Sequence, residues 1–287
     1  MGVFKRELSQ EFIDALNELY KDQNSFWHKM VIDPELFIAF RYNYISIYLN
    51  GQSISELSFP NKRIRGKIHK KYLGINEETY AYTEGEKILE EDSRIKSLAD
   101  LAQIKENIKK HFGAEKVNSY NEILNGDNNI LDVEAVFVNN RIPNPIAHKD
   151  YEQSKIDYVG LEYNQTNDLK LVFYEAKLFG NPEIRSTTRP KVLDQILRYE
   201  RTIEQHRDEI VIAYDNVRQY LNELHISDNG NFRDNKMLSE NISIDFKPRL
   251  IIFGIDRNKD SDMHIQNLKK ELGDKRVILK HQKKPYD

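Results

Sequence analysis

The sequence predicts an α/β protein of the α+β kind, in which a central mixed sheet flanked by helices follows a smaller α+β domain. Hydrophobic residues recur at helical spacing in some segments and alternate, as in strands, in others. The length of 287 residues with 39% hydrophobic content suffices for one large core or two modest ones. A change from basic to acidic composition places the expected boundary near residue 95, between an N-terminal domain 1–95 and a second domain 96–287.

Composition excludes several classes of protein. The chain has no cysteine, which rules out disulfides, Cys-ligated zinc and a thiol nucleophile, and fits a reducing compartment such as the cytoplasm. No apolar stretch approaches the roughly 18 residues of a membrane helix, and no targeting signal is visible. The sequence also lacks a P-loop motif. We therefore expect a cytoplasmic protein without membrane contact and without an ATPase motor of its own.

The N-terminal elements begin with a helical period over residues 4–20, which predicts an amphipathic helix. A period of two follows and predicts a three-stranded meander over 37–40, 44–48 and 54–59. Asn50-Gly51 is a strong turn signal between the last two strands. We expect this domain to recognise substrate or a partner.

A basic segment follows the meander. Residues 61–72 contain six Lys or Arg and no acid, and residues 76–95 are acidic with little apolar periodicity. Such a run is usually a solvated face, although it could also neutralise phosphates while an aromatic ring stacks on a base. The candidate nucleic-acid contacts in this segment are Lys62, Arg63, Arg65 and Lys67.

The second domain is expected to have the order α-β-β-β-α-α-β-α. Helical periods predict helices near 98–112, 190–206, 210–224 and 264–272, and the β-rich runs are 130–138, 155–163, 169–179 and 249–254. Ser186 to Pro190 supply capping residues and a first-turn proline for the second helix. Arg189 and Lys191 lie at its start, where a helix N-terminus favours phosphate. A basic tail is expected to close the chain.

One group of residues has the composition of a metal-dependent site. Asp157 lies on one predicted strand, and Glu175-Ala-Lys177 lies near the end of the next. Residues two apart in a strand face the same side, so the hairpin can bring two carboxylates and an ammonium to one patch. The carboxylates, with the Ala176 carbonyl, supply the hard oxygen ligands that Mg²⁺ prefers, and Lys177 can orient a water or offset developing charge. This combination is suited to phosphodiester hydrolysis.

In these residues the chain resembles the PD-(D/E)xK nuclease superfamily, whose restriction-endonuclease-like core has the order α-β-β-β-α-β. Gln195 and Tyr199, on the helix after Glu175-Ala-Lys177, resemble the QxxxY motif of the RecB-type branch and share one helix face. The resemblance covers roughly residues 98–255. It implies that Asp157, Glu175 and Ala176 hold Mg²⁺ or Mn²⁺, that Lys177 acts on the attacking water, and that Gln195 and Tyr199 orient the site or touch the nucleic-acid backbone.

The sequence departs from the family pattern at two places. Ile156 precedes Asp157 where the family name has proline, and the upstream acidic residue has no unique match. Glu106 on the predicted helix and Glu134 on the first predicted strand are the alternatives. The resemblance further implies a DNA substrate, with RNA less favoured, and a role in restriction, phage defence, recombination or repair. A helicase or ATPase partner and a homodimer are compatible with it.

Two alternatives stay open. The (D/E)xK triplet is weak alone, because Asp168-Leu-Lys170, Asp234-Asn-Lys236 and Asp245-Phe-Lys247 also match it, and Glu175 and Lys177 could form a solvated salt bridge. The chain could instead be a scaffold or nucleic-acid-binding subunit that does not cut. Its intact Asp, Glu and Lys favour an active nuclease over that alternative.

Overall fold

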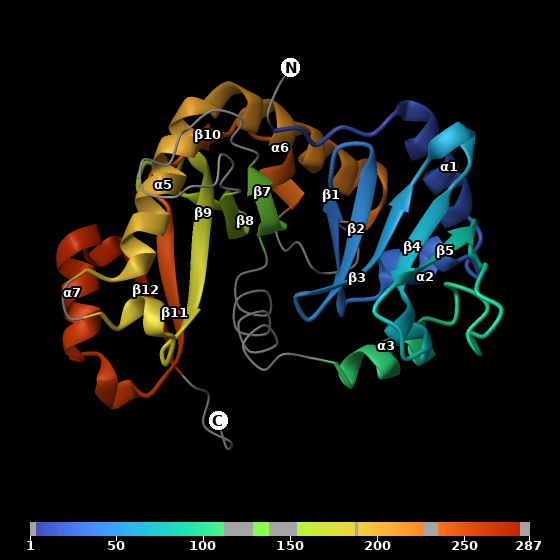
Figure 1. Cartoon of the computed structure of the whole chain (residues 1–287). Helices are drawn as coiled ribbons and strands as arrows, with labels where there is room; N and C mark the ends of the chain where they lie inside the picture. Colours follow the sequence, from blue (N-terminus) through green and yellow to red (C-terminus); the bar gives the residue numbers. More distant parts are fainter. Residues whose placement is uncertain (1–3, 112–128, 138–153, 187–188, 227–234, 282–287) are drawn as a thin grey trace, which may run out of the picture. The chain divides into compact units, whose positions relative to one another are not determined.

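The computed structural model describes residues 4–111, 129–137, 154–186, 189–226 and 235–281 (Figure 1). It confirms a mixed α+β protein, with two sheets and six α-helices among those residues. The chain divides into two compact units. The N-terminal unit comprises residues 5–117 and 213–239, and the second unit comprises residues 1–4, 118–212 and 240–287.

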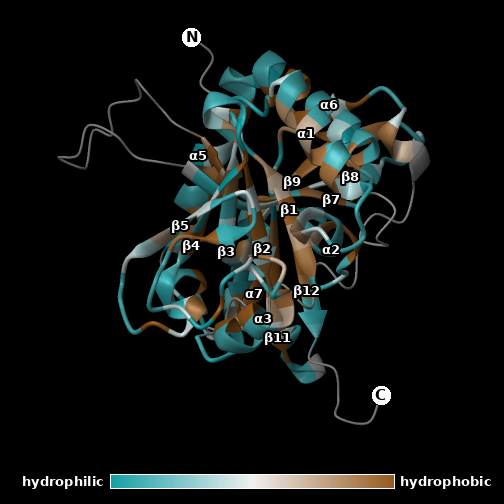
Figure 2. Ribbon diagram, turned by 90° about the vertical axis from the view of Figure 1, so that its right-hand side faces the viewer, coloured by the Kyte–Doolittle hydropathy of each residue, from teal (hydrophilic) through white to brown (hydrophobic). Residues whose placement is uncertain are grey.

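The N-terminal unit contains an antiparallel sheet of six strands in sequence order. Its strands are β1 (Leu36–Phe40), β2 (Tyr44–Leu49), β3 (Gln52–Ser58), β4 (Arg65–His69), β5 (Tyr80–Glu84) and β6 (Lys87–Ile88). The predicted meander is confirmed, and Asn50 and Gly51 both have the positive φ of a tight hairpin turn. Hydrophobic residues run along β1 and β2, whereas β4 and β5 carry many hydrophilic ones (Figure 2).

The sheet extends beyond the predicted three-stranded meander, so the expectation that only a basic segment follows it was wrong. The basic segment forms β4, and the acidic segment contributes β5 and β6. Ile68 of β4 and Ala81 of β5 are buried opposite each other, while the charged and aromatic neighbours take the other face. The charge runs mask this alternation, because only every second residue contacts the core.

Among the described residues, three helices lie wholly within the N-terminal unit: α1 (Gln10–Tyr20), α2 (Phe26–Ile32) and α3 (Leu101–Lys109). The Ser9 side chain accepts a hydrogen bond from the Phe12 backbone, so α1 begins at residue 10 rather than at residue 4. The seven-residue α2 was not predicted from the sequence.

The division of the chain differs from the expected boundary near residue 95. Helix α3 contacts the N-terminal unit through Asn107, whose amide donates to the Tyr72 carbonyl at 3.1 Å, and through Lys105, which pairs with Asp33 at 2.8 Å. Residues 213–239 also return to this unit. Local composition cannot reveal such a return, because it depends on contacts between residues far apart in the sequence.

The second unit contains a mixed sheet in the order β12-β11-β9-β8-β7, with β10 paired to β9. The strands are β7 (Ile130–Phe137), β8 (Ser154–Tyr163), β9 (Leu169–Leu178), β10 (Ser243–Ile244), β11 (Arg249–Ile255) and β12 (Val277–His281). Pairing is antiparallel across β7, β8 and β9 and parallel from β9 through β11 to β12. The four predicted strands are confirmed, whereas part of the expected basic tail forms β12.

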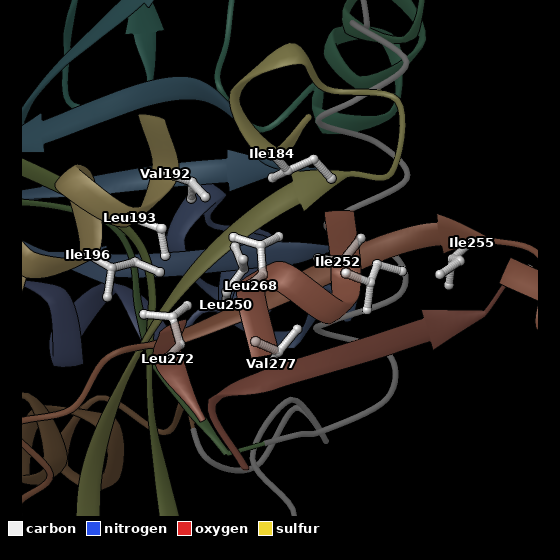
Figure 3. Close-up of a cluster of buried hydrophobic side chains, with 11 residues drawn as sticks. Ile184, Val192, Leu193, Ile196, Leu250, Ile252, Ile255, Leu268, Leu272 and Val277 are labelled. Atoms are coloured by element: carbon white, nitrogen blue, oxygen red, sulfur yellow. The ribbon is translucent and has the colours of Figure 1, made fainter. Parts of the chain in front are cut away.

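Helices α5 (Lys191–Gln205) and α7 (Met263–Leu272) pack against this sheet. Figure 3 shows side chains from α5, α7 and β11 converging in one buried hydrophobic cluster. Pro190 is the N-cap residue of α5 and forms no side-chain cap, and Thr187 and Thr188, which were expected to supply capping, lie outside the described residues. None of the described helices is long and apolar enough to cross a membrane.

The remaining helices are α6 and short 3₁₀ turns. They are α6 (Arg207–Glu223), η1 (Pro60–Lys62), η2 (Lys70–Leu73), η3 (Pro182–Ile184), η5 (Asn235–Leu238), η6 (Arg257–Lys259) and η7 (Asp274–Arg276). Helix α6 begins in the second unit and continues in the N-terminal unit from Ala213.

Truncating Ile265 should destabilise the second unit. The side chain is fully buried between α7 and the sheet, so Ile265→Ala removes apolar contacts and leaves a cavity, at a cost of about 2–5 kcal/mol. Ile212→Ala is the matched control, because Ile212 is 60% exposed and its loss should change stability by about 0.5 kcal/mol or less. Urea unfolding of both variants measures the difference. Equal midpoints would contradict the described packing of α7.

Candidate functional site

The candidate site lies where β8 separates from β9. Their antiparallel pairs run from Tyr163 opposite Leu169 to Tyr158 opposite Tyr174. Beyond that pair β9 continues beside β11, and the Asp157 carboxylate accepts a hydrogen bond from the Ala176 backbone N–H at 2.8 Å. A side chain thus takes the place of a strand partner. The separation leaves the Asp157 carboxylate beside the end of β9.

Glu175 and Lys177 project from the same face of β9, as the spacing predicted. Glu175 is 1% exposed, and its Oε1 lies 2.7 Å from the Lys177 Nζ. Its Oε2 lies 3.2 Å from the Tyr199 hydroxyl. Leu250 and Ile252 of β11 pair with Glu175 and Lys177 and are buried, so the two charged side chains stand beside the hydrophobic core of this unit.

Burial raises the proton affinity of both carboxylates. Burial and the neighbouring Asp157 raise the pKa of Glu175 to about 8. Burial also raises the pKa of Asp157, although the Ala176 N–H and Lys177 oppose that shift. Burial alone would lower the pKa of Lys177, but Glu175 and Glu183 outweigh it and raise the pKa, so the lysine stays charged. Without a cation, Glu175 is therefore mostly protonated near pH 7, and added positive charge would favour its ionised form.

Gln195 and Tyr199 reach this site from α5. Tyr199 is almost fully buried, and its hydroxyl accepts a hydrogen bond from the Gln195 Nε2 at 2.7 Å. The same hydroxyl donates to the Lys155 backbone carbonyl on β8. The prediction that Gln195 and Tyr199 share one helix face is confirmed. Together they link α5 to β8 beside Glu175.

Glu134 lies on β7 next to this site, a position that the sequence alone could not establish. Its neighbours Val133 and Ala135 pair with Tyr158 and Ile156, which places Glu134 opposite Asp157. Its carboxylate pairs with Lys155 at 2.8 Å and contributes to the raised pKa of Asp157. Glu134 also has a φ of 52°, a rare conformation for a non-glycine residue within a strand.

Glu106, the alternative third acid, lies on α3 in the N-terminal unit. Its carboxylate is exposed and pairs with Lys109 at 3.2 Å. Of the two alternatives, Glu134 is the one in the same unit as Asp157 and in its electrostatic field.

Glu183 was not identified from the sequence. It lies on η3, after the end of β9, and its carboxylate is 2.8 Å from the Lys177 Nζ. Asn181 caps this turn by accepting a hydrogen bond from the Glu183 backbone at 2.9 Å. The Asn181-Pro182 sequence was the available signal, since it predicts a tight turn directly after β9.

The predicted nucleic-acid contacts are distributed over both units. Arg189 pairs with Asp194 at 2.7 Å, and Lys191 is the exposed first residue of α5. In the N-terminal unit, Lys62 and Arg65 are exposed. Arg63 pairs with Glu84 at 3.0 Å and Lys67 with Glu56 at 3.3 Å. Acids from neighbouring strands thus neutralise part of the basic segment.

The donor set fits a hard divalent cation. Asp157 and Glu175 offer carboxylate oxygens, and a cation would offset the burial and the Asp157 charge that raise the pKa of Glu175. Within the described ranges no three His, Asp or Glu side chains form a ready metal cage. Mg²⁺ needs no such cage, because water and substrate phosphate commonly complete its coordination.

Comparisons with known proteins give no indication of function, so any proposal depends on the geometry of the site. No protein-family model, no curated protein and no solved structure matches the chain.

Removing the Tyr199 hydroxyl should uncouple α5 from β8. Tyr199→Phe leaves the Lys155 carbonyl and the Gln195 amide without this partner, at an expected cost of about 1–2 kcal/mol in unfolding free energy. Gln195→Ala should then cost less in the Tyr199→Phe background than in the wild type. A double-mutant cycle by urea unfolding measures this coupling. Strict additivity of the two substitutions would contradict it.

The raised pKa of Glu175 predicts a pH-dependent stability in EDTA. Between its ordinary pKa of 4.5 and about 8, the folded chain binds more protons at Glu175 than the unfolded chain does. The resulting stabilisation is fully present below 4.5 and is lost as the pH rises through 8. Wild type should therefore lose stability relative to Glu175→Gln between pH 5 and 9. Parallel curves of unfolding free energy against pH would refute the shift.

Proposed function

We propose that the protein is a metal-dependent nuclease that hydrolyses phosphodiester bonds in DNA. The observation that carries the proposal is the grouping of Asp157, Glu175 and Lys177 at the separation of β8 from β9. Gln195 and Tyr199 contact the same site from α5. These five residues match in type and order the motifs of the PD-(D/E)xK superfamily with the QxxxY element.

The strand order of the second unit supports the same proposal. Antiparallel β7, β8 and β9 are followed by α5 and then by β11, which returns parallel to β9. This is the arrangement expected for a restriction-endonuclease-like core. The described part of this unit contains no helix before β7, since α3 belongs to the N-terminal unit. Residues 112–128, which precede β7, lie outside the described ranges.

Asp157, Glu175 and the Ala176 carbonyl are the groups proposed to hold Mg²⁺ or Mn²⁺. A bound divalent cation would polarise the phosphoryl oxygen and lower the pKa of a water. Lys177, which stays protonated, is proposed to orient the attacking water and to offset charge on the phosphate. Glu183 would hold the lysine through a second ion pair. Tyr199 and Gln195 hold Glu175 in place.

The substrate and pathway are proposed from chemistry and resemblance. Lys191 and Arg189, at the start of α5, would contact backbone phosphates beside the site. DNA is favoured over RNA, and restriction, phage defence or repair in the cytoplasm are the suggested settings. A helicase or ATPase partner would supply any motor, and a homodimer would allow both strands of a duplex to be cut.

Substituting the site should abolish metal-dependent cleavage. Asp157→Asn and Glu175→Gln remove metal ligands, and Lys177→Ala should lower turnover by about 100-fold or more while leaving metal binding intact. The matched control is Lys170→Ala in the Asp168-Leu-Lys170 triplet, which lies at the other end of β9 and should cleave as wild type. The assay uses linear, supercoiled and single-stranded DNA and RNA with Mg²⁺, Mn²⁺ or EDTA.

Each result has a defined meaning. Full activity of purified Lys177→Ala would refute the proposed role of the lysine. Cleavage that survives both Asp157→Asn and Glu175→Gln would place the activity elsewhere or in a contaminant. Absence of cleavage by wild type, with DNA binding retained, would favour the scaffold alternative or an activating partner.

A further inference from the structure

A second site of interest lies within the N-terminal unit, on the sheet face formed by β3, β4 and β5. Glu56 pairs with Lys67, Lys67 with Tyr82, and His69 with Tyr80 across the antiparallel strands. Residues directly opposite in such pairs project from the same face. The intervening Ile68 and Ala81 are buried on the other face. One face of the sheet therefore combines cations with aromatic rings.

This face is hollowed by a cavity of about 330 Å³. One wall consists of residues 52–56 of β3, and the other contains Lys67, His69, Lys71, Tyr72 and Tyr80. Its size falls in the range of small-ligand pockets. A β-bulge in β3, where Tyr48 pairs with Ser53 and Ile47 with Ser55, interrupts the regular pairing beside it.

Three aromatic rings border the cavity. The His69 ring lies 5.2 Å from the Tyr80 ring and 5.6 Å from the Tyr72 ring, measured between centroids. Tyr72 is buried, and Tyr80 is 50% exposed although it is a large aromatic residue. Burial and the charge of Lys71 lower the pKa of His69, which keeps its ring neutral at pH 7. The rings present flat apolar surface to a ligand.

The charges at the cavity favour an anion. Lys67 and Lys71 outnumber the single lining carboxylate, Glu56. Lys67 lies 3.3 Å from Glu56, and its Nζ is 4.2 Å from the centroid of the Tyr80 ring. Lys71 lies 4.0 Å from Glu78, which is 86% exposed. Such solvated pairs contribute little, so a phosphate can replace the carboxylates at modest cost.

From this combination we propose that the cavity binds one nucleotide with an unpaired base. The base would stack against Tyr80 and His69, and its phosphate would contact Lys67 and Lys71. A bare phosphate would leave the rings unused, and an uncharged aromatic ligand would leave both lysines unused. A base within a duplex is stacked and paired, and cannot present its face. The ligand is either a free nucleotide or an unpaired position in a strand, and the second source rests on the proposed nuclease function.

The test is equilibrium binding in EDTA, so that no cleavage is required. The probes are the four deoxynucleoside 5′-monophosphates, a fluorescein-labelled dT12 single strand and a 12-base-pair duplex. Tyr80→Ala should weaken binding of the recognised probe by about tenfold or more, because it removes a stacking surface. Lys71→Ala should weaken it and reduce its salt dependence.

The matched control is Tyr42→Ala. Tyr42 is also in the N-terminal unit, is 49% exposed and has Lys5 at 5.2 Å from its ring, but it does not line the cavity. This variant should bind within twofold of wild type. Both tyrosines are exposed, so melting temperatures should stay close to the wild-type value and serve as the folding control.

The outcomes separate this proposal from the nuclease proposal. Tyr80-dependent binding of dT12 alone assigns the cavity to a strand, and Tyr80-dependent binding of a mononucleotide assigns it to a free nucleotide. Either result supports the site even in a chain that never cleaves. Failure of wild type to bind any unpaired probe, or equal binding by Tyr80→Ala, overturns the site. Cleavage that depends on Glu175 would then still support the nuclease.

Discussion

The hydrogen bond from the Ala176 N–H to the Asp157 carboxylate is the constraint on which the candidate site depends. It occurs where the β8–β9 pairing stops, so it satisfies a donor that would otherwise lose its strand partner. The Tyr199 hydroxyl does the same for the Lys155 carbonyl on the other strand. These two side chains satisfy backbone groups on both strands where the pairing stops, beside Glu175 and Lys177. An ordinary β-ladder would satisfy these groups with the backbone of the partner strand.

The charged side chains of the candidate site are held in place by contacts with neighbouring elements. Burial raises the pKa of both Asp157 and Glu175, and the Asp157 charge raises the pKa of Glu175 further. Lys177 partly opposes these shifts, Glu183 forms a second ion pair with the lysine, and Tyr199 contacts Glu175. Glu134 adds further negative charge from a strained backbone position. Conformational strain of this kind persists only where surrounding structure enforces it.

Sequence patterns predicted the long elements of the second unit well. Strands β7, β8, β9 and β11 and helices α5, α6 and α7 are long enough for their periods to be clear. The short elements were missed for local reasons: β4 carries alternate charges, and β12 has only three consecutive apolar residues in a basic stretch. The position of α3 could not be predicted, because it depends on contacts of Lys105 and Asn107 with residues of the N-terminal unit that are far away in sequence.

The candidate site was predictable to the extent that it is encoded in fixed spacings. Glu175 and Lys177, two apart on a strand, and Gln195 and Tyr199, four apart on a helix, lie together as those periods require. Glu183 pairs with Lys177 across a turn, and hydrophobic periodicity does not predict the direction in which a turn leads the chain. The choice between Glu106 and Glu134 likewise needed strand register.

The position of β12 has a consequence for handling the protein. This strand is the outermost one of its sheet and covers β11, whose Leu250, Ile251, Ile252 and Phe253 are all buried. Without β12, the apolar β11 would present a row of unpaired N–H and C=O groups, which is a template for strand addition by another molecule. By pairing with β11, β12 therefore prevents this strand from pairing with another molecule. Tags and truncations at that end are best chosen to leave residues 277–281 intact.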